Sequence, residues 1–166
     1  LEPVIRHNAL DIVGLAALLV LAASYLQDPS LAEREGEHLG LAQLFERRGD
    51  MDTAEECLDR ELTRCREGKI RAEVIKRMAL CKKRRKLYQE AARLWSELLP
   101  ALDKRAFTEL IVHTDYREGD MQRSKELIHE ALERLSLTPA QRRNLEERLV
   151  RLQRRMDAES SGVPEE

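Results

Sequence analysis

Apolar side chains recur at the three- and four-residue spacing of amphipathic helices along most of this chain, and glycine, proline or capping residues separate the helical segments. Between residues 37 and 48 the apolar stripe includes Leu41 and Phe45. Gly49 then ends the helix, and the side chain of Asp50 can cap the next one. The predicted helix pairs comprise residues 37–48 with 51–62, residues 70–81 with 88–99, and a third pair centred on Leu110 and Ile128.

The first predicted helix, residues 4–26, differs from the others because it is apolar on most of its circumference. Its most apolar part, residues 12–23, has Asp11 at its edge and is shorter than the roughly 20 residues of a membrane span. No basic segment precedes it and the chain does not start with Met. We therefore expect a buried helix without membrane contact, in a segment excised from a longer protein. Residues 28–36 form a charged linker.

The helix pairs repeat with a period of about 33 to 37 residues, which is typical of tetratricopeptide-type solenoids, where each hairpin buries its apolar face against its neighbours. In the first pair, the characteristic positions of the tetratricopeptide sequence pattern are occupied by Leu41, Ala42, Phe45, Gly49, Ala54 and Leu58. The later pairs match in part: Lys82 and Lys86 stand at the aromatic and glycine positions, and Ser124 stands where Ala is usual. We expect an all-α chain with a tetratricopeptide-like helical repeat domain at residues 37–157.

A long charged helix is predicted after the third pair. Thr138, Pro139 and Gln141 form a capping signature at its start. A stripe from Leu145 to Met156 lets this helix cover the open end of the last repeat. Residues 158–166 are rich in acidic residues and contain Gly and Pro, so we expect a disordered tail there.

The composition supports helices and limits the classes of function. The 166 residues include only 7 Gly, 5 Pro and 6 aromatic residues, which leaves few strand formers and excludes all-β and α/β folds. A net charge of −2 excludes a protein whose whole surface binds a polyanion. Three Cys without a CxxC spacing indicate a reducing compartment, which we take to be the cytoplasm, and a zinc site with His38 or His113 lacks ligand spacing.

His7 and Asp11 are four residues apart and therefore share one face of the first helix. A carboxylate beside an imidazole on a helix that is otherwise buried needs a partner, and a divalent metal or a hydrolytic water fits that place. In the alternative interpretation, both groups are solvated and Asp11 interacts favourably with the helix dipole near the N-terminus.

The segment from His7 to Leu19, HNALDIVGLAALL, resembles the closing helix of ribonuclease H-like exonucleases of the DEDD superfamily, and most closely that of the bacterial YprB-type proteins. The segments from Tyr88 to Trp95, from Glu109 to Asp120 and from Arg143 to Leu152 resemble the helical tail of the same family. The resemblance implies that residues 1–27 are the last helix of a nuclease domain.

The resemblance also implies roles for two residues. Asp11 takes the position of the last metal-binding carboxylate, for Mg²⁺ or Mn²⁺, and His7 takes the position of the general base with the spacing of the tyrosine-type members. Two-metal hydrolysis needs several carboxylates, and the strands that carry the others are absent from this chain. We therefore expect the chain alone to be inert and to need no cofactor, and its parent protein to be a metal-dependent 3'–5' exonuclease-like nuclease.

Five consecutive cations, Lys82, Lys83, Arg84, Arg85 and Lys86, fall at the turn of the second helix pair. Such a run can contact the phosphates of single-stranded nucleic acid, although no aromatic residue lies among them to stack on a base. The alternative is a solvated loop, since charge runs are common in turns.

Two functions are consistent with these features. The first is a non-catalytic C-terminal module of a nuclease that positions nucleic acid or a protein partner. The second is a tetratricopeptide-type scaffold that binds a peptide in the concave groove of the repeats. Salt-dependent binding of single strands at the basic run distinguishes the first from the second.

Overall fold

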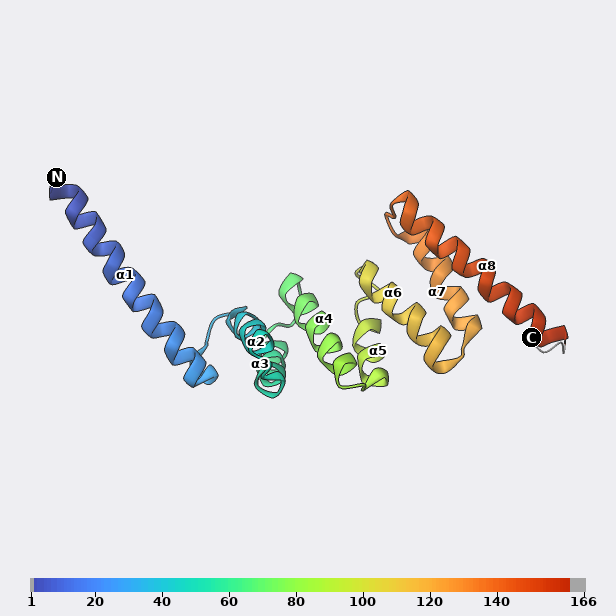
Figure 1. Ribbon diagram of the computed structural model, residues 1–166, viewed down its shortest axis with the longest axis horizontal. Coiled ribbons are helices and arrows are strands. Elements are labelled where there is room, and N and C mark those ends of the chain that lie inside the picture. Colours follow the sequence, from blue (N-terminus) through green and yellow to red (C-terminus); the bar gives the residue numbers. More distant parts are fainter. Residues whose placement is uncertain (1, 162–166) are drawn as a thin grey trace. The chain divides into compact units, whose positions relative to one another are not determined.

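The computed structural model describes residues 2–161; 82% of these residues lie in helices, and none lies in a strand (Figure 1). The low content of Gly, Pro and β-branched residues accounts for this composition of secondary structure. The elements are α1 (Glu2–Gln27), η1 (Pro29–Leu31), α2 (Glu37–Arg48), α3 (Met51–Arg64), α4 (Lys69–Arg84), α5 (Tyr88–Ser96), α6 (Lys104–His113), η2 (Thr114–Glu118), α7 (Met121–Arg134) and α8 (Pro139–Ser161). The all-α prediction is confirmed.

The chain divides into two compact units, Leu1–Val74 and Ile75–Glu166, which we call the N-terminal and C-terminal units. In the N-terminal unit, α2 and α3 pack against each other as a hairpin. Its turn follows the sequence prediction: Gly49 ends α2 with φ +81°, a conformation that suits a residue without Cβ. Asp50 then caps α3 by accepting a hydrogen bond from the Thr53 N–H at 3.1 Å.

Small and aliphatic side chains form the core of this hairpin. The residues that are at most 5% exposed include Leu41, Ala42, Phe45, Ala54, Cys57 and Leu58. These are the residues on the predicted apolar stripes, or next to them, because helical spacing brings them to one face. Cys57, Cys65 and Cys81 are all buried, and none of them forms a disulfide.

In the C-terminal unit, α5 packs on α6, α6 on α7, and α7 on α8, as the neighbouring ribbons of Figure 1 show. Trp95 and Phe107 are 2% and 1% exposed and are therefore core residues of this unit. Gly119 has φ +69° at the turn before α7, and Asp120 caps α7 through the Arg123 N–H at 2.8 Å. The predicted signature before α8 forms a reciprocal capping box between Thr138 and Gln141.

Three boundaries in this unit differ from the sequence prediction. Helix α5 ends at Ser96, and residues 97–102 form turns in which Leu102 has a positive φ of 56°. One turn of π-helix, η2, follows α6 directly, which spacing alone did not indicate. Helix α8 continues to Ser161, so residues 158–161 are helical where we expected a disordered tail; the rest of that predicted tail, residues 162–166, lies outside the described residues.

Candidate functional sites

The structure brings His7 and Asp11 together on α1. His7 Nε2 lies 3.5 Å from Asp11 Oδ2, and the two side chains are 75% and 60% exposed. In residues 2–161, no group of three or more His, Cys, Asp or Glu side chains is arranged to hold a metal ion. The pair therefore supplies one carboxylate and one imidazole on an open helix face, which is too few ligands for a two-metal site by itself.

Helix α1 carries a large exposed apolar surface. None of its described side chains is buried, and ten large apolar ones are exposed, from 46% at Leu21 to 72% at Leu19. Residues 12–23, which by themselves are too short to span a membrane, are part of a continuous helix of 26 residues. An 18-residue window within this helix has a mean hydropathy of 2.2. By length and composition alone, α1 is therefore able to cross a membrane, and the length argument against a span does not hold for the whole helix.

The basic run lies where the sequence predicts it, at the end of α4. Lys82 Nζ lies 3.3 Å from Glu90 Oε2, and Lys83 Nζ lies 2.5 Å from Glu109 Oε2, so both cations join α4 to neighbouring helices. Arg84 and Arg85 also interact within the protein, and Lys86 has a positive φ of 62° in the turn. The run thus has a structural role, whether or not it also contacts phosphates.

A buried carboxylate at the start of the α2–α3 hairpin was not found from the sequence. Glu61 is 0% exposed, and its side chain accepts hydrogen bonds from the N–H groups of Gly36 and His38, at 2.8 and 3.1 Å, and from Cys65 Sγ, at 3.0 Å. Glu61 therefore caps the N-terminus of α2 from the neighbouring helix, where no side chain of its own caps the helix. Position 61 lies 25 residues after Gly36, so spacing gave no signal.

Burial and hydrogen bonding act in opposite directions on this cluster. Burial by itself raises the pKa of Glu61, but the Cys65 thiol and three backbone N–H groups together hold that pKa below its usual range. Burial, with the Glu61 carboxylate nearby, raises the pKa of the Cys65 thiol to about 12. Burial also lowers the pKa of His38, and neither ring nitrogen of His38 has a hydrogen-bond partner. The cluster is a structural cap with an inert thiol.

A second buried carboxylate connects α8 to the π-helix η2 in the C-terminal unit. Asp115, whose side chain is 3% exposed, accepts hydrogen bonds from Arg148 at 2.9 Å and from Arg155 at 2.6 Å. Arg142 donates to the Leu132 carbonyl at the end of α7. The partners of these three arginines lie on other elements, so the arginines connect α8 to η2 and α7.

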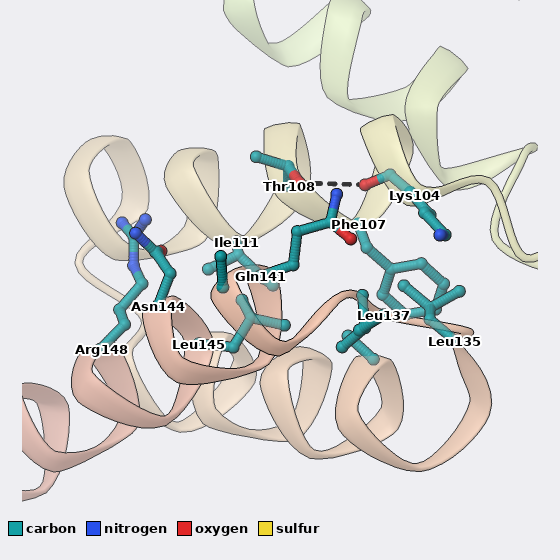
Figure 2. Close-up of a pocket in the computed structure, with 12 residues that line it drawn as sticks. Lys104, Phe107, Thr108, Ile111, Leu135, Leu137, Gln141, Asn144, Leu145 and Arg148 are labelled. Carbon is teal, nitrogen blue, oxygen red and sulfur yellow. Dashed lines mark hydrogen bonds between the residues drawn. The ribbon is translucent and has the colours of Figure 1, made fainter.

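An open groove of about 310 Å³ lies between α6, α7 and α8 in the C-terminal unit, here called the α6–α8 groove. Figure 2 shows Phe107, Leu135 and Leu137 at one end, with Lys104 near them, and Asn144 and Arg148 together at the other. The groove is lined by Lys104, Phe107, Thr108, Ile111, Ala131, Leu135, Leu137, Ala140, Gln141, Asn144, Leu145 and Arg148. It combines an apolar floor with a rim of basic and amide groups.

Comparison with known proteins assigns this chain to no family. A scan against protein-family models, a search of curated proteins and a search of solved structures each return no match.

Proposed function

We propose that this chain is a non-catalytic C-terminal helical module of a cytoplasmic ribonuclease H-like exonuclease. In this proposal, α1 packs on the nuclease domain as its closing helix, and the helical hairpins form a tetratricopeptide-like solenoid that positions nucleic acid or a protein partner. The observation that carries it is the apolar surface of α1, which is exposed over its whole length in the described chain. A helix that is apolar all round is stable in water only when another structure covers it.

We take a protein domain, rather than a bilayer, as the cover of this surface, because α1 resembles the closing helix of a nuclease domain. The most apolar part of α1 runs from Ile12 to Ala23. His7 and Asp11, which lie just before this part, share one open face at 3.5 Å. A carboxylate beside an imidazole, on a helix that another domain covers, matches a site completed by carboxylates from that domain, with Mg²⁺ or Mn²⁺ as the metal.

The first experiment compares two lengths of the protein. The chain of 166 residues is expected to show no cleavage of labelled single- or double-stranded DNA or RNA with Mg²⁺ or Mn²⁺. The proposed parent protein, which includes the nuclease domain, is expected to cleave these substrates. Asp11→Asn in that protein is expected to abolish cleavage, because the loss of a metal ligand disrupts the two-metal site. Asp28→Asn, beyond the end of α1, is the matched control and is expected to keep activity. Metal-dependent cleavage by the short chain, or full activity of Asp11→Asn, contradicts the proposal.

The second experiment tests what covers α1. Deletion of residues 1–27 is expected to raise solubility and to leave the helical far-UV circular dichroism of the remaining hairpins intact. If the deletion instead unfolds the hairpins while the intact chain is monomeric at high concentration by light scattering, α1 is an integral part of the solenoid. Stable insertion of the intact chain into phosphatidylcholine vesicles, resistant to carbonate extraction, identifies α1 as a membrane helix and equally overturns the proposal.

The alternative function is a tetratricopeptide-type scaffold that binds a peptide. Two observations favour it: Lys82 and Lys83 of the basic run are paired with carboxylates, and the α6–α8 groove has an apolar floor. Salt-dependent binding of a single-stranded oligonucleotide that Lys86→Glu weakens supports the nuclease module. Absence of that binding, with peptide binding retained, supports the scaffold.

A further inference from the structure

We propose that the α6–α8 groove binds a short extended protein segment that carries aliphatic side chains next to acidic ones. This inference concerns the C-terminal unit alone, and it does not depend on whether α1 packs on a nuclease domain. It rests on the shape and lining of the groove, on the charge of the unit and on the way Arg148 is held.

The groove has the size and floor of a site for side chains. Its volume of about 310 Å³ lies at the lower end of the roughly 300–1,000 Å³ of ligand pockets. Aliphatic groups of Leu137 and Leu145, which are both partly exposed, form its floor (Figure 2). Such a floor gains free energy when aliphatic side chains displace water from it.

The floor favours a peptide over a nucleic acid. Single-stranded nucleic acids bind by stacking bases on exposed aromatic rings along a basic track. The one aromatic residue that lines the groove is Phe107, which is 1% exposed and therefore presents no ring face for a base. The remaining apolar lining is aliphatic, which suits the side chains of a polypeptide.

The polar rim selects an acidic partner. Two cations, Lys104 and Arg148, lie at the two ends of the groove, and none of the residues that line it is Asp or Glu. The whole C-terminal unit has the same sign of charge: residues 75–166 carry 20 Lys and Arg against 16 Asp and Glu, a net charge of +4. Residues 1–74 carry 9 against 15, a net charge of −6. The positive potential around the groove attracts acidic segments and speeds their association.

Arg148 is preorganised for a second carboxylate. Arg148 Nη2 donates a hydrogen bond to Asp115 Oδ2 at 2.9 Å, and the Arg148 side chain is only 15% exposed. The guanidinium is therefore held in place before any ligand arrives. Its Nε is buried without a hydrogen-bond partner among the described residues, so in this proposal a ligand carboxylate bonds the terminal Nη groups of the guanidinium. One helical turn earlier, Asn144 is exposed and adds an amide that can bond the ligand backbone. Gln141 contributes similarly, since its carbonyl oxygen is taken by the Thr138 N–H and its amide N–H₂ can donate.

The test is a titration of the ¹⁵N-labelled full chain with the peptide acetyl-Gly-Leu-Glu-Leu-Glu-Glu-amide, followed by NMR. We expect the backbone amide signals of Thr108, Asn144 and Leu145 to shift. One control peptide has Lys in place of every Glu, and a second has Ser in place of every Leu. Each control peptide is expected to bind at least about tenfold more weakly than the acidic peptide. The first lacks the charge, and the second lacks the aliphatic side chains, that the groove binds.

Two variants separate a groove contact from a general charge effect. Asn144→Glu places a carboxylate at the rim and is expected to weaken peptide binding about tenfold. Arg143→Gln lowers the net charge by the same single unit at the neighbouring, exposed position, which does not line the groove, and is expected to change binding by less than about twofold. Far-UV circular dichroism and thermal melting of both variants check that the fold is kept.

Three results overturn the proposal. The first is the absence of shifts in the groove amides with the acidic peptide at millimolar concentration. The second is equal weakening by Asn144→Glu and Arg143→Gln, which places the interaction in the overall charge of the unit. The third is a single-stranded oligonucleotide that shifts the groove amides when the peptide does not, which makes the groove a nucleic-acid site.

Discussion

Glu61 offers the sharpest test of how the N-terminal unit is stabilised. In Glu61→Ala, the N–H groups of Gly36 and His38 and the thiol of Cys65 lose their acceptor in a buried place. Each buried donor left without a partner costs about 1–3 kcal/mol, and partial entry of water reduces the sum. We therefore expect Glu61→Ala to lower the free energy of unfolding by about 3–5 kcal/mol.

Glu61→Gln separates the charge of this side chain from its shape. Gln keeps one carbonyl oxygen for either backbone N–H but turns an amide N–H₂ toward the other, so we expect a loss of about 1–3 kcal/mol. Glu56, exposed on the same helix, provides the control: Glu56→Ala and Glu56→Gln are expected to stay within about 0.5 kcal/mol of the parent.

The assay is urea unfolding with two probes. Far-UV circular dichroism follows the helices of both units, whereas fluorescence of Trp95, the single Trp of the chain, follows the C-terminal unit. Hydrogen exchange at the amides of Gly36 and His38 then reports the α2 cap directly, and we expect protection there to fall in Glu61→Ala and to be kept in Glu56→Ala. If Glu61→Ala and Glu56→Ala unfold at the same urea concentration, the buried cap has no energetic role and the argument fails.

The pH dependence of this cap follows from the lowered pKa of Glu61. Because the folded state holds the pKa below the usual value of 4.5, the carboxylate stabilises the fold above that pH. The stabilisation is lost as the pH falls below 4.5 and through the folded-state pKa. Glu61→Gln should remove this part of the acid sensitivity, which acid titrations of the parent and the variant, followed by circular dichroism, will measure.

Three further predictions concern other buried side chains. Because burial lowers the pKa of His38, the free energy of unfolding should decline as the pH falls from 6.5 toward the folded-state pKa. In urea titrations His38→Leu should flatten that decline, whereas the control His129→Leu, at an exposed position, should leave it unchanged. Asp115→Ala leaves Arg148 and a second arginine of α8 without their acceptor and should cost about 3 kcal/mol, measured by Trp fluorescence in urea; an unchanged midpoint contradicts the tie between α8 and η2. Trp95→Ala should cost about 3–5 kcal/mol by leaving a cavity, and an unchanged melting temperature would place Trp95 outside the core.

Helix ends, caps and core positions could be predicted from the sequence because they depend on local interactions. Helix α2 ends at the predicted residue, 48, because Gly49 and Asp50 set the turn with bonds to residues at most five positions away. The capping box of Thr138 and Gln141 was predicted for the same reason. Apolar periodicity likewise identified the core positions, since i, i+3 and i+4 spacing defines a helix face whatever packs against it.

Long-range contacts were decided only by the tertiary structure. Glu61 and Asp115 look like any surface acids, and apart from Cys65 their partners lie 23 to 40 residues away along the chain, so no local spacing marks them. The α6–α8 groove likewise exists only once three helices have packed. What covers α1 is a question of the same kind: the sequence determines that this helix is apolar on all sides, but a surface of that kind is completed by residues from outside the helix.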